Sequence, residues 1–217
     1  MIYALAKTLL LLFISAVVIF PCPANAGDIE DVDSEAATHS AIFTKGRKSL
    51  QLVSGVLFSP TVVGPRTHVF NYAQTNLRIG WMLNSPRTSK SLLRGNVEAI
   101  FEITNSIIFK GSGDYMGGIT GLIRYNFIQP HTKFFPYVQG GIGVIYNDAY
   151  KDHSQDAIGQ AIEFTPQFSS GFRYLINENC SIDAEAMFHH ISNAGLADRN
   201  SGINAFGGFI GLTHFYD

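Results

Sequence analysis

From about residue 49 to the end of the chain, apolar and polar side chains alternate with a period of two. In the segment 182–192 the even positions are apolar up to Phe188, whereas the odd positions include Asp183 and Glu185. Such alternation places successive side chains on opposite faces of a β-strand. The pattern recurs and predicts an all-β chain of eight strands, at 49–59, 68–83, 92–109, 114–129, 134–148, 161–176, 179–192 and 203–216.

The connections between these strands favour a closed barrel. Those after the second, fourth and sixth strands are short, at 84–88, 129–131 and 176–179. Those after the first, fifth and seventh are longer, though the one after the third is short. An even number of antiparallel strands, with short turns at one end and longer loops at the other, is typical of outer-membrane barrels. Strands of this length also suit a tilted membrane crossing. We therefore expect an eight-stranded antiparallel up-and-down barrel.

Alternation alone leaves two kinds of barrel open. A membrane barrel turns its apolar face to lipid and its polar face to the lumen, whereas a lipocalin-type barrel does the reverse. Long strands, aromatic residues near strand ends such as Trp81 and Tyr174, and the N-terminal segment favour the membrane barrel. Ile182, Ala184 and Phe188 then face outward, as does Ala186. The charged residues expected inside are Arg78, Glu98, Glu102, Arg124, Arg173, Asp183 and Glu185.

The first 26 residues have the pattern of a secretory signal peptide. Lys7 is their one charged residue, an apolar run extends from Leu9 to Phe20, and Ala24-Asn25-Ala26 matches the small-x-small cleavage site. The run is short for a membrane span. We expect a signal peptide at 1–26 and export of the protein. An acidic tail at 27–48 and the barrel at 49–217 follow.

Composition narrows the range of functions. Lys and Arg total 15 against 17 for Asp and Glu, a net charge of −2, which argues against a polybasic nucleic-acid-binding protein. Charged residues make up only 15%, below the roughly 25% typical of soluble domains. His131, His153 and His214 are scattered without metal-ligand spacing. We expect neither a metal nor a cofactor. The sequence leaves open whether the protein forms a homodimer.

The candidate chemistry lies at the end of the seventh predicted strand. His190 and Ser192 are two residues apart and therefore project from the same, lipid-facing side. If both termini are periplasmic, this strand ends at the outer leaflet, which contains lipopolysaccharide in Gram-negative bacteria. A serine hydroxyl becomes a good nucleophile when an imidazole accepts its proton. Taken alone, this spacing is common by chance, and polar residues near headgroups are the alternative explanation.

The wider motif is more specific. The segment His190-Ile191-Ser192-Asn193-Ala194-Gly195-Leu196, followed by Asn200 and Gly202-Ile203, resembles the signature of the lipid A 3-O-deacylase (PagL-type) family of eight-stranded outer-membrane barrels. The resemblance implies Ser192 as nucleophile and His190 as general base. It also implies Asn193 and the backbone near Gly195 as oxyanion donors. The implied reaction, at the outer membrane, is hydrolysis of the ester at position 3 of lipid A, which releases a 3-hydroxy fatty acid.

The third catalytic position departs from that family. The family's acid falls where this chain has Asn204. An amide can accept a hydrogen bond from imidazole and fix its tautomer, but it cannot offer an imidazolium a full countercharge. Asp198, on the loop, is the nearest substitute carboxylate. Two hypotheses follow: a lipid A deacylase that uses Ser192, His190 and Asn204, or a non-catalytic barrel with a structural or lipid-binding role.

Overall fold

The structure is a computed structural model that describes residues 42–60, 69–86 and 91–217. The predicted signal peptide and most of the acidic tail lie outside these residues. The strands are β1 (Lys48–Phe58), β2 (Asn71–Met82), β3 (Gly95–Lys110), β4 (Tyr115–Phe127), β5 (Phe134–Asn147), β6 (Ile162–Phe164), β7 (Gln167–Asn177), β8 (Cys180–Ile191) and β9 (Ile203–Tyr216), with a 3-10 helix η1 (Ala149–Lys151). Among the described residues, no helix is long and apolar enough to cross a membrane.

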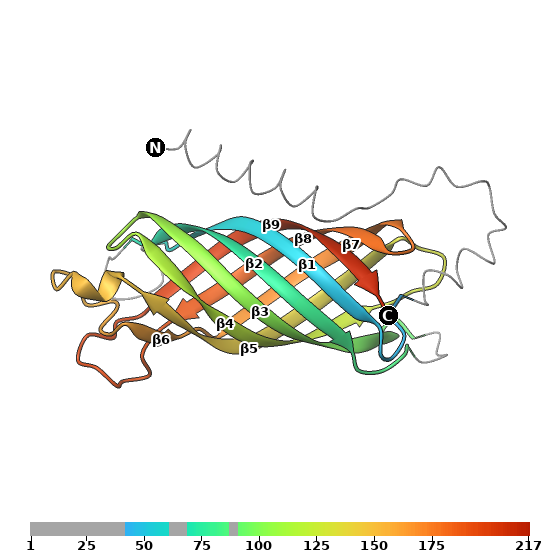
Figure 1. Cartoon of the computed structure of the whole chain (residues 1–217), viewed down its shortest axis with the longest axis horizontal. Helices are drawn as coiled ribbons and strands as arrows, with labels where there is room; N and C mark the ends of the chain where they lie inside the picture. The colour runs from blue at the N-terminus through green and yellow to red at the C-terminus, as the bar shows by residue number, and fades with distance from the viewer. Residues whose placement is uncertain (1–41, 61–68, 87–90) are drawn as a thin grey trace.

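Eight of these strands close into an antiparallel barrel (Figure 1). β9 pairs with β1, and the β4–β5 ladder completes the ring. The predicted eight-stranded up-and-down barrel is therefore confirmed. The extra strand β6 arises because the predicted strand 161–176 is interrupted at Thr165 and Pro166, where proline has no N–H to donate to a ladder.

The two ends of the barrel differ. The end at which β8 terminates carries η1, β6 and the connections 148–161 and 192–202, and is called the loop end below (Figure 1). The opposite end carries the end of β9 and the connection between β7 and β8, and is called the turn end. This division matches the expected connections at most places. The β2–β3 connection at the turn end is longer than the predicted 84–88, because β3 begins at Gly95, and the β3–β4 connection at the loop end is short, at 111–114.

The register of the ladders staggers the barrel by ten residues. A row of paired, outward-facing residues begins at Ser192 and crosses β6 at Phe164, β5 at Val144 and β4 at Ile119. It continues around the remaining strands and returns to β8 at Ile182, ten residues before its start. Because a closed barrel requires tilted strands, residues along this row lie progressively farther from the loop end.

Charged side chains fill the middle of the interior. All seven residues predicted to face inward are buried, as expected for a membrane barrel. Arg78 lies 2.6 Å from Glu102 and 2.7 Å from Glu185, and Arg124 lies 3.3 Å from Glu98. A buried charge is tolerated when a countercharge and hydrogen bonds accompany it. Mutually compensating ion pairs therefore hold the charged residues in the middle of the interior.

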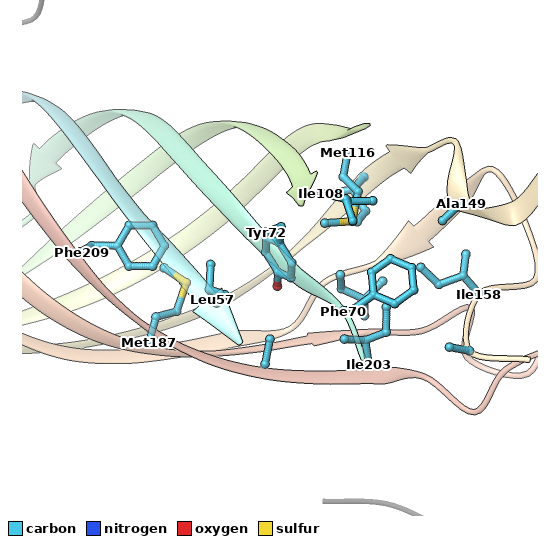
Figure 2. Packing of buried hydrophobic residues seen from close by; sticks show 14 of the residues in the cluster. Leu57, Phe70, Tyr72, Ile108, Met116, Ala149, Ile158, Met187, Ile203 and Phe209 are labelled. Atoms are coloured by element: carbon cyan, nitrogen blue, oxygen red, sulfur yellow. The ribbon is translucent and has the colours of Figure 1, made fainter. Parts of the chain in front are cut away.

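Apolar clusters close the interior at both ends. Figure 2 shows the cluster at the loop end, which extends from Met187 and Phe209 inside the barrel to Ala149 and Ile158 in the connection between β5 and β6. The cluster at the turn end comprises Ile42, Phe43, Met82, Ile128, Phe135, Leu175 and Phe215. Ile42 and Phe43 were expected in the acidic tail. Their burial extends the barrel unit before residue 49, because an inserted apolar segment that is not a strand carries no period-two signal.

The outer face of β8 is apolar, as predicted. Ile182 and Ala186 are exposed, and Ala184 and Phe188 are half-buried, whereas the residues between them are buried. An apolar outside and a charged inside exclude the lipocalin-type arrangement. The outer wall is thus suited to contact with lipid.

Candidate active site

The candidate site lies at the loop end of β8, on the outside of the barrel. Ser192 forms an isolated bridge with Phe164, in which the Phe164 N–H donates to the Ser192 carbonyl (2.8 Å) and the Ser192 N–H donates to the Phe164 carbonyl (3.1 Å). The His190 N–H donates to the Pro166 carbonyl at 3.0 Å. The main chain at both candidate residues is therefore held by the neighbouring segment 164–166, at the end of β6 and just after it.

The side chains of Ser192, His190 and Asn204 form a connected line. His190 Nε2 lies 3.0 Å from Ser192 Oγ, and His190 Nδ1 lies 2.7 Å from Asn204 Oδ1. The β8–β9 register pairs Asn204 directly with His190. Because an amide oxygen only accepts, the imidazole donates through Nδ1 and leaves Nε2 to accept the serine proton. The predicted proximity of these three side chains is confirmed.

Gly202 leaves room for the imidazole. Its φ of +72° lies in the left-handed region that favours glycine. A Cβ at this position would lie 3.2 Å from His190 Cε1, tighter than an ordinary contact. Residue 202 therefore needs both a left-handed backbone and the absence of a side chain.

The two predicted oxyanion donors are engaged within the loop. Asn193 is fully buried, its Nδ2 donates to the Arg199 carbonyl at 2.9 Å, and its Oδ1 accepts the Gly195 N–H at 3.0 Å. Its own N–H donates to Asn200 Oδ1 at 2.9 Å. Asn193 thus holds the loop together on the inner side of Ser192. The Gly195 N–H and one of the two Nδ2 protons of Asn193 are thus already used within the loop, and an oxyanion role for either residue stays a prediction.

The other candidate residues lie apart from this line. Asp198 is exposed on the loop, and the ring nitrogens of His190 bond Asn204 and Ser192, so Asp198 does not take the third position. His189 faces inward, as expected, where its Nδ1 lies 2.6 Å from the buried Tyr72 hydroxyl. Within the described ranges, no group of three or more metal-ligating side chains is arranged to hold a metal ion.

Comparison with known proteins identifies the family. The family model for lipid A 3-O-deacylase (PagL) matches residues 60–213, most of the chain. The chain belongs to the lipid A 3-O-deacylase family. Members of this family are lipid A deacylases, so the family assigns the barrel to the hydrolases. No protein with a curated description matches the sequence.

Solved structures support the same fold for this deacylase-family barrel. The outer membrane enzyme PagL superimposes with a TM-score of 0.50 at 18% identity, covering 75% of this chain and 97% of that one. The N-terminal β-barrel domain of Pseudomonas aeruginosa OprF gives 0.53 at 13% identity, covering 79% and 98%. Neisserial surface protein A gives 0.53 at 14% identity, covering 78% and 99%. These matches show an outer-membrane β-barrel.

An apolar hollow of about 330 Å³ lies on the outer wall beside the site of this deacylase-family chain. Gly121 opens it: the residue pairs with Phe101 on one side and Ile142 on the other, and no atom of the described chain lies within 4 Å of the place a Cβ would occupy. Phe164, the partner of Ser192, forms one wall. Sequence reasoning missed the hollow, because it depends on the register of several strands.

Proposed function

We propose that this chain hydrolyses the ester at position 3 of lipid A, with Ser192 as nucleophile and His190 as general base. The observation that carries the proposal is the 3.0 Å contact between Ser192 Oγ and His190 Nε2 on the lipid-facing wall, with the opposite ring nitrogen held by Asn204. Membership of the deacylase family supports lipid A as substrate. Export to the outer membrane through residues 1–26 is part of the same proposal.

The proposed reaction proceeds through an acyl-enzyme. Ser192 Oγ attacks the acyl carbonyl carbon while its proton passes to His190 Nε2. The imidazolium then returns this proton to the sugar oxygen as the ester bond breaks. A water molecule then attacks the carbonyl carbon of the acyl-serine while its proton passes to His190 Nε2. The imidazolium gives this proton to Ser192 Oγ as the bond from that oxygen to the acyl carbon breaks and the 3-hydroxy acid leaves. Both half-reactions use the same nitrogen, so the tautomer set by Asn204 serves both.

Asn204 orients the ring without contributing a charge. A carboxylate in this position would stabilise the imidazolium more strongly. The cost of desolvating a carboxylate here is modest, because water reaches the rim of the barrel. We infer that the amide gives up part of the transition-state stabilisation that a carboxylate would supply.

The hollow beside Phe164 provides a place for the acyl chain of the substrate. The row from Ser192 through Phe164 and Val144 to Ile119 spans three strand spacings of about 4.8 Å each. Its residues face outward, and they lie deeper along the barrel with each strand. An acyl chain whose carbonyl carbon lies at Ser192 Oγ can follow this row into the membrane.

Mass spectrometry of lipid A tests the function. We expect lipid A from Gram-negative cells that produce the wild-type barrel to lose one 3-hydroxyacyl mass, with free 3-hydroxy acid released. Ser192→Ala should abolish the release and still give a folded, heat-modifiable barrel. Release by Ser192→Ala at the wild-type rate would contradict the assignment.

The alternative is a non-catalytic barrel with a structural or lipid-binding role, and Asn204 in place of an acid is the observation that favours it. The same assay distinguishes the two, with Asn204→Glu as an added variant. Intact lipid A from cells that produce either the wild type or Asn204→Glu would support the non-catalytic barrel.

A further inference from the structure

Arg199 joins two connections at the loop end. The residue is partly buried, and its guanidinium donates to three main-chain carbonyls. Nη1 donates to those of Asp152 (2.8 Å) and Gln155 (3.0 Å), and Nη2 donates to that of Tyr150 (2.7 Å). All three carbonyls belong to the connection between β5 and β6. A planar guanidinium with fixed donors is well suited to hold several acceptors at once.

The main chain of Arg199 leads directly to the nucleophile. Its carbonyl accepts the side-chain amide of Asn193, the residue that follows Ser192. Gly159, in the connection between β5 and β6, packs so closely that a Cβ there would overlap the Arg199 carbonyl oxygen. Arg199 therefore contacts the connection between β5 and β6 through its side chain, and it supports Asn193, the residue after Ser192, through its backbone carbonyl.

The same connection also supports the imidazole side of the site. The N–H groups of Ser201 and Gly202 donate to the carbonyls of Asp156 (2.9 Å) and Ala157 (3.0 Å). Gly202 is the residue that lies against the His190 ring. The connection between β5 and β6 thus reaches both the nucleophile and the base through the loop 193–202.

The connection is itself anchored on its far side. Ser112 Oγ donates to Asp152 Oδ2 at 2.6 Å, and Asp148 Oδ1 accepts the N–H groups of Asp114 (2.9 Å) and Tyr115 (3.0 Å). Hydrogen bonds from Ser112 and Ser154 lower the pKa of Asp152 to about 2, so its carboxylate remains ionised at neutral pH. A segment tied to the β3–β4 turn in this way can act as a rigid support.

We propose that Arg199 is a positioning residue, which fixes Ser192 in line with His190 by fastening the loop 193–202 to the connection between β5 and β6. The inference rests on the proposed function, since it takes Ser192 as the nucleophile. Without the guanidinium, the loop loses the three hydrogen bonds that fasten Arg199 to the connection, and the Arg199 carbonyl that holds the Asn193 side chain is less firmly placed. Small displacements of a nucleophile reduce the rate of the chemical step far more than they reduce substrate binding.

The test compares Arg199→Ala with Arg199→Lys and with a matched control, Arg94→Ala. Arg94 is also partly buried, and its Nη1 donates to the Ile128 carbonyl (2.8 Å), but it lies at the turn end. The measurements are kcat and KM for release of 3-hydroxy acid from lipid A in mixed micelles, the rate at which a fluorophosphonate labels Ser192, and the thermal midpoint of the heat-modifiable barrel.

We expect Arg199→Ala to lower kcat and the labelling rate by about 10- to 100-fold while KM stays near the wild-type value. Arg199→Lys should recover part of the loss, because an ammonium group reaches fewer of the three carbonyls. Gly159→Ala should also lower kcat, and its effect should not add to that of Arg199→Ala, since both loosen one junction. Arg94→Ala should leave kcat and labelling unchanged.

The inference is overturned if Arg199→Ala loses no more activity than Arg94→Ala. It is also overturned if Arg199→Ala changes KM but not kcat, or if its loss of activity is no greater than its loss of folded barrel. Failure of the proposed function gives a different result: the wild type releases no 3-hydroxy acid. In that case the fluorophosphonate still measures the reactivity of Ser192, and equal labelling of wild type and Arg199→Ala overturns the inference on its own.

Discussion

The two faces of β8 place polar groups in opposite ways. On the inner face, Asp183 and Glu185 meet Arg173 (3.0 Å) and Arg78 (2.7 Å) as buried ion pairs. On the outer face, the imidazole of His190 meets a neutral amide. Countercharges line the lumen, whereas the wall beside the site offers apolar side chains. The comparison teaches that the lumen holds its charged groups by pairing them with countercharges, whereas the site on the lipid-facing wall pairs its imidazole with an uncharged amide.

Two consecutive histidines show how strongly the face decides the role. His189 is buried against the Tyr72 hydroxyl, and His190 is half-buried between Ser192 and Asn204. Both are imidazoles within one strand. Only His190, which faces outward, contacts a hydroxyl that a membrane lipid can reach. Which of the two histidines can take part in the candidate chemistry is therefore decided by the alternation of side chains along the strand.

The largest expected effect separates these two histidines. His190→Ala and Ser192→Ala should each reduce kcat at least about a thousandfold, and the double variant should lose no more, because the two groups act as a unit. His189→Ala should leave kcat within a few-fold of wild type and lower stability instead, since it strands the Tyr72 hydroxyl. Kinetics on lipid A together with unfolding in detergent check both expectations. A large loss of kcat in folded His189→Ala would contradict the division between the faces.

A lumen substitution should have the opposite effect: it should lower the stability of the barrel and leave the activity of the folded protein unchanged. Glu98 lies 3.3 Å from Arg124 and 3.2 Å from Arg173, and it accepts the Ser49 hydroxyl at 2.6 Å. Glu98→Ala should destabilise the barrel by about 3–5 kcal/mol, because it leaves two buried guanidinium groups without this carboxylate. Denaturant unfolding in lipid vesicles measures the loss. The fraction that stays folded should deacylate normally; an inactive but fully stable variant would show that the lumen controls the site directly.

Strand periodicity and register explain why much of this could be predicted. Period two determines which face each residue occupies, and the pairing of two consecutive antiparallel strands brings Asn204 opposite His190. The contacts of Arg199 and the burial of Ile42 and Phe43 could not be predicted in this way, because loops and inserted segments have no period. The hollow at Gly121 required the register of several strands, which turn lengths alone do not set.

A smaller effect is expected at the amide that orients the base. Asn204→Ala should reduce kcat by about tenfold, well below the loss in His190→Ala, because the ring loses its orienting acceptor but keeps its proton-accepting nitrogen. Asn204→Glu should match or exceed the wild type, since a carboxylate stabilises the imidazolium and water reaches the rim. The kcat values of the three proteins on lipid A test this order. If Asn204→Ala is as inactive as His190→Ala, the amide does more than orient the ring.

The smallest expected effect concerns the apolar wall itself. Gly121→Leu should fill the hollow beside Phe164 without disturbing the backbone, because no atom of the described chain lies within 4 Å of its Cβ position. If the acyl chain lies there, kcat/KM for long-chain lipid A should fall a few-fold, while hydrolysis of a short-chain ester should not change, since one misplaced side chain in an apolar site has a limited effect.

Gly208→Leu is the matched control. Gly208 is another exposed strand glycine with open space, on β9 and outside the hollow, where the nearest described atom is 3.9 Å away. Equal losses in both variants would mean that the chain does not select this side of Ser192, and a loss in Gly208→Leu alone would place it along β9. A loss confined to Gly121→Leu and to long acyl chains would show that the outer wall selects its substrate by shape. The two faces of the barrel would then differ in function as they do in polarity.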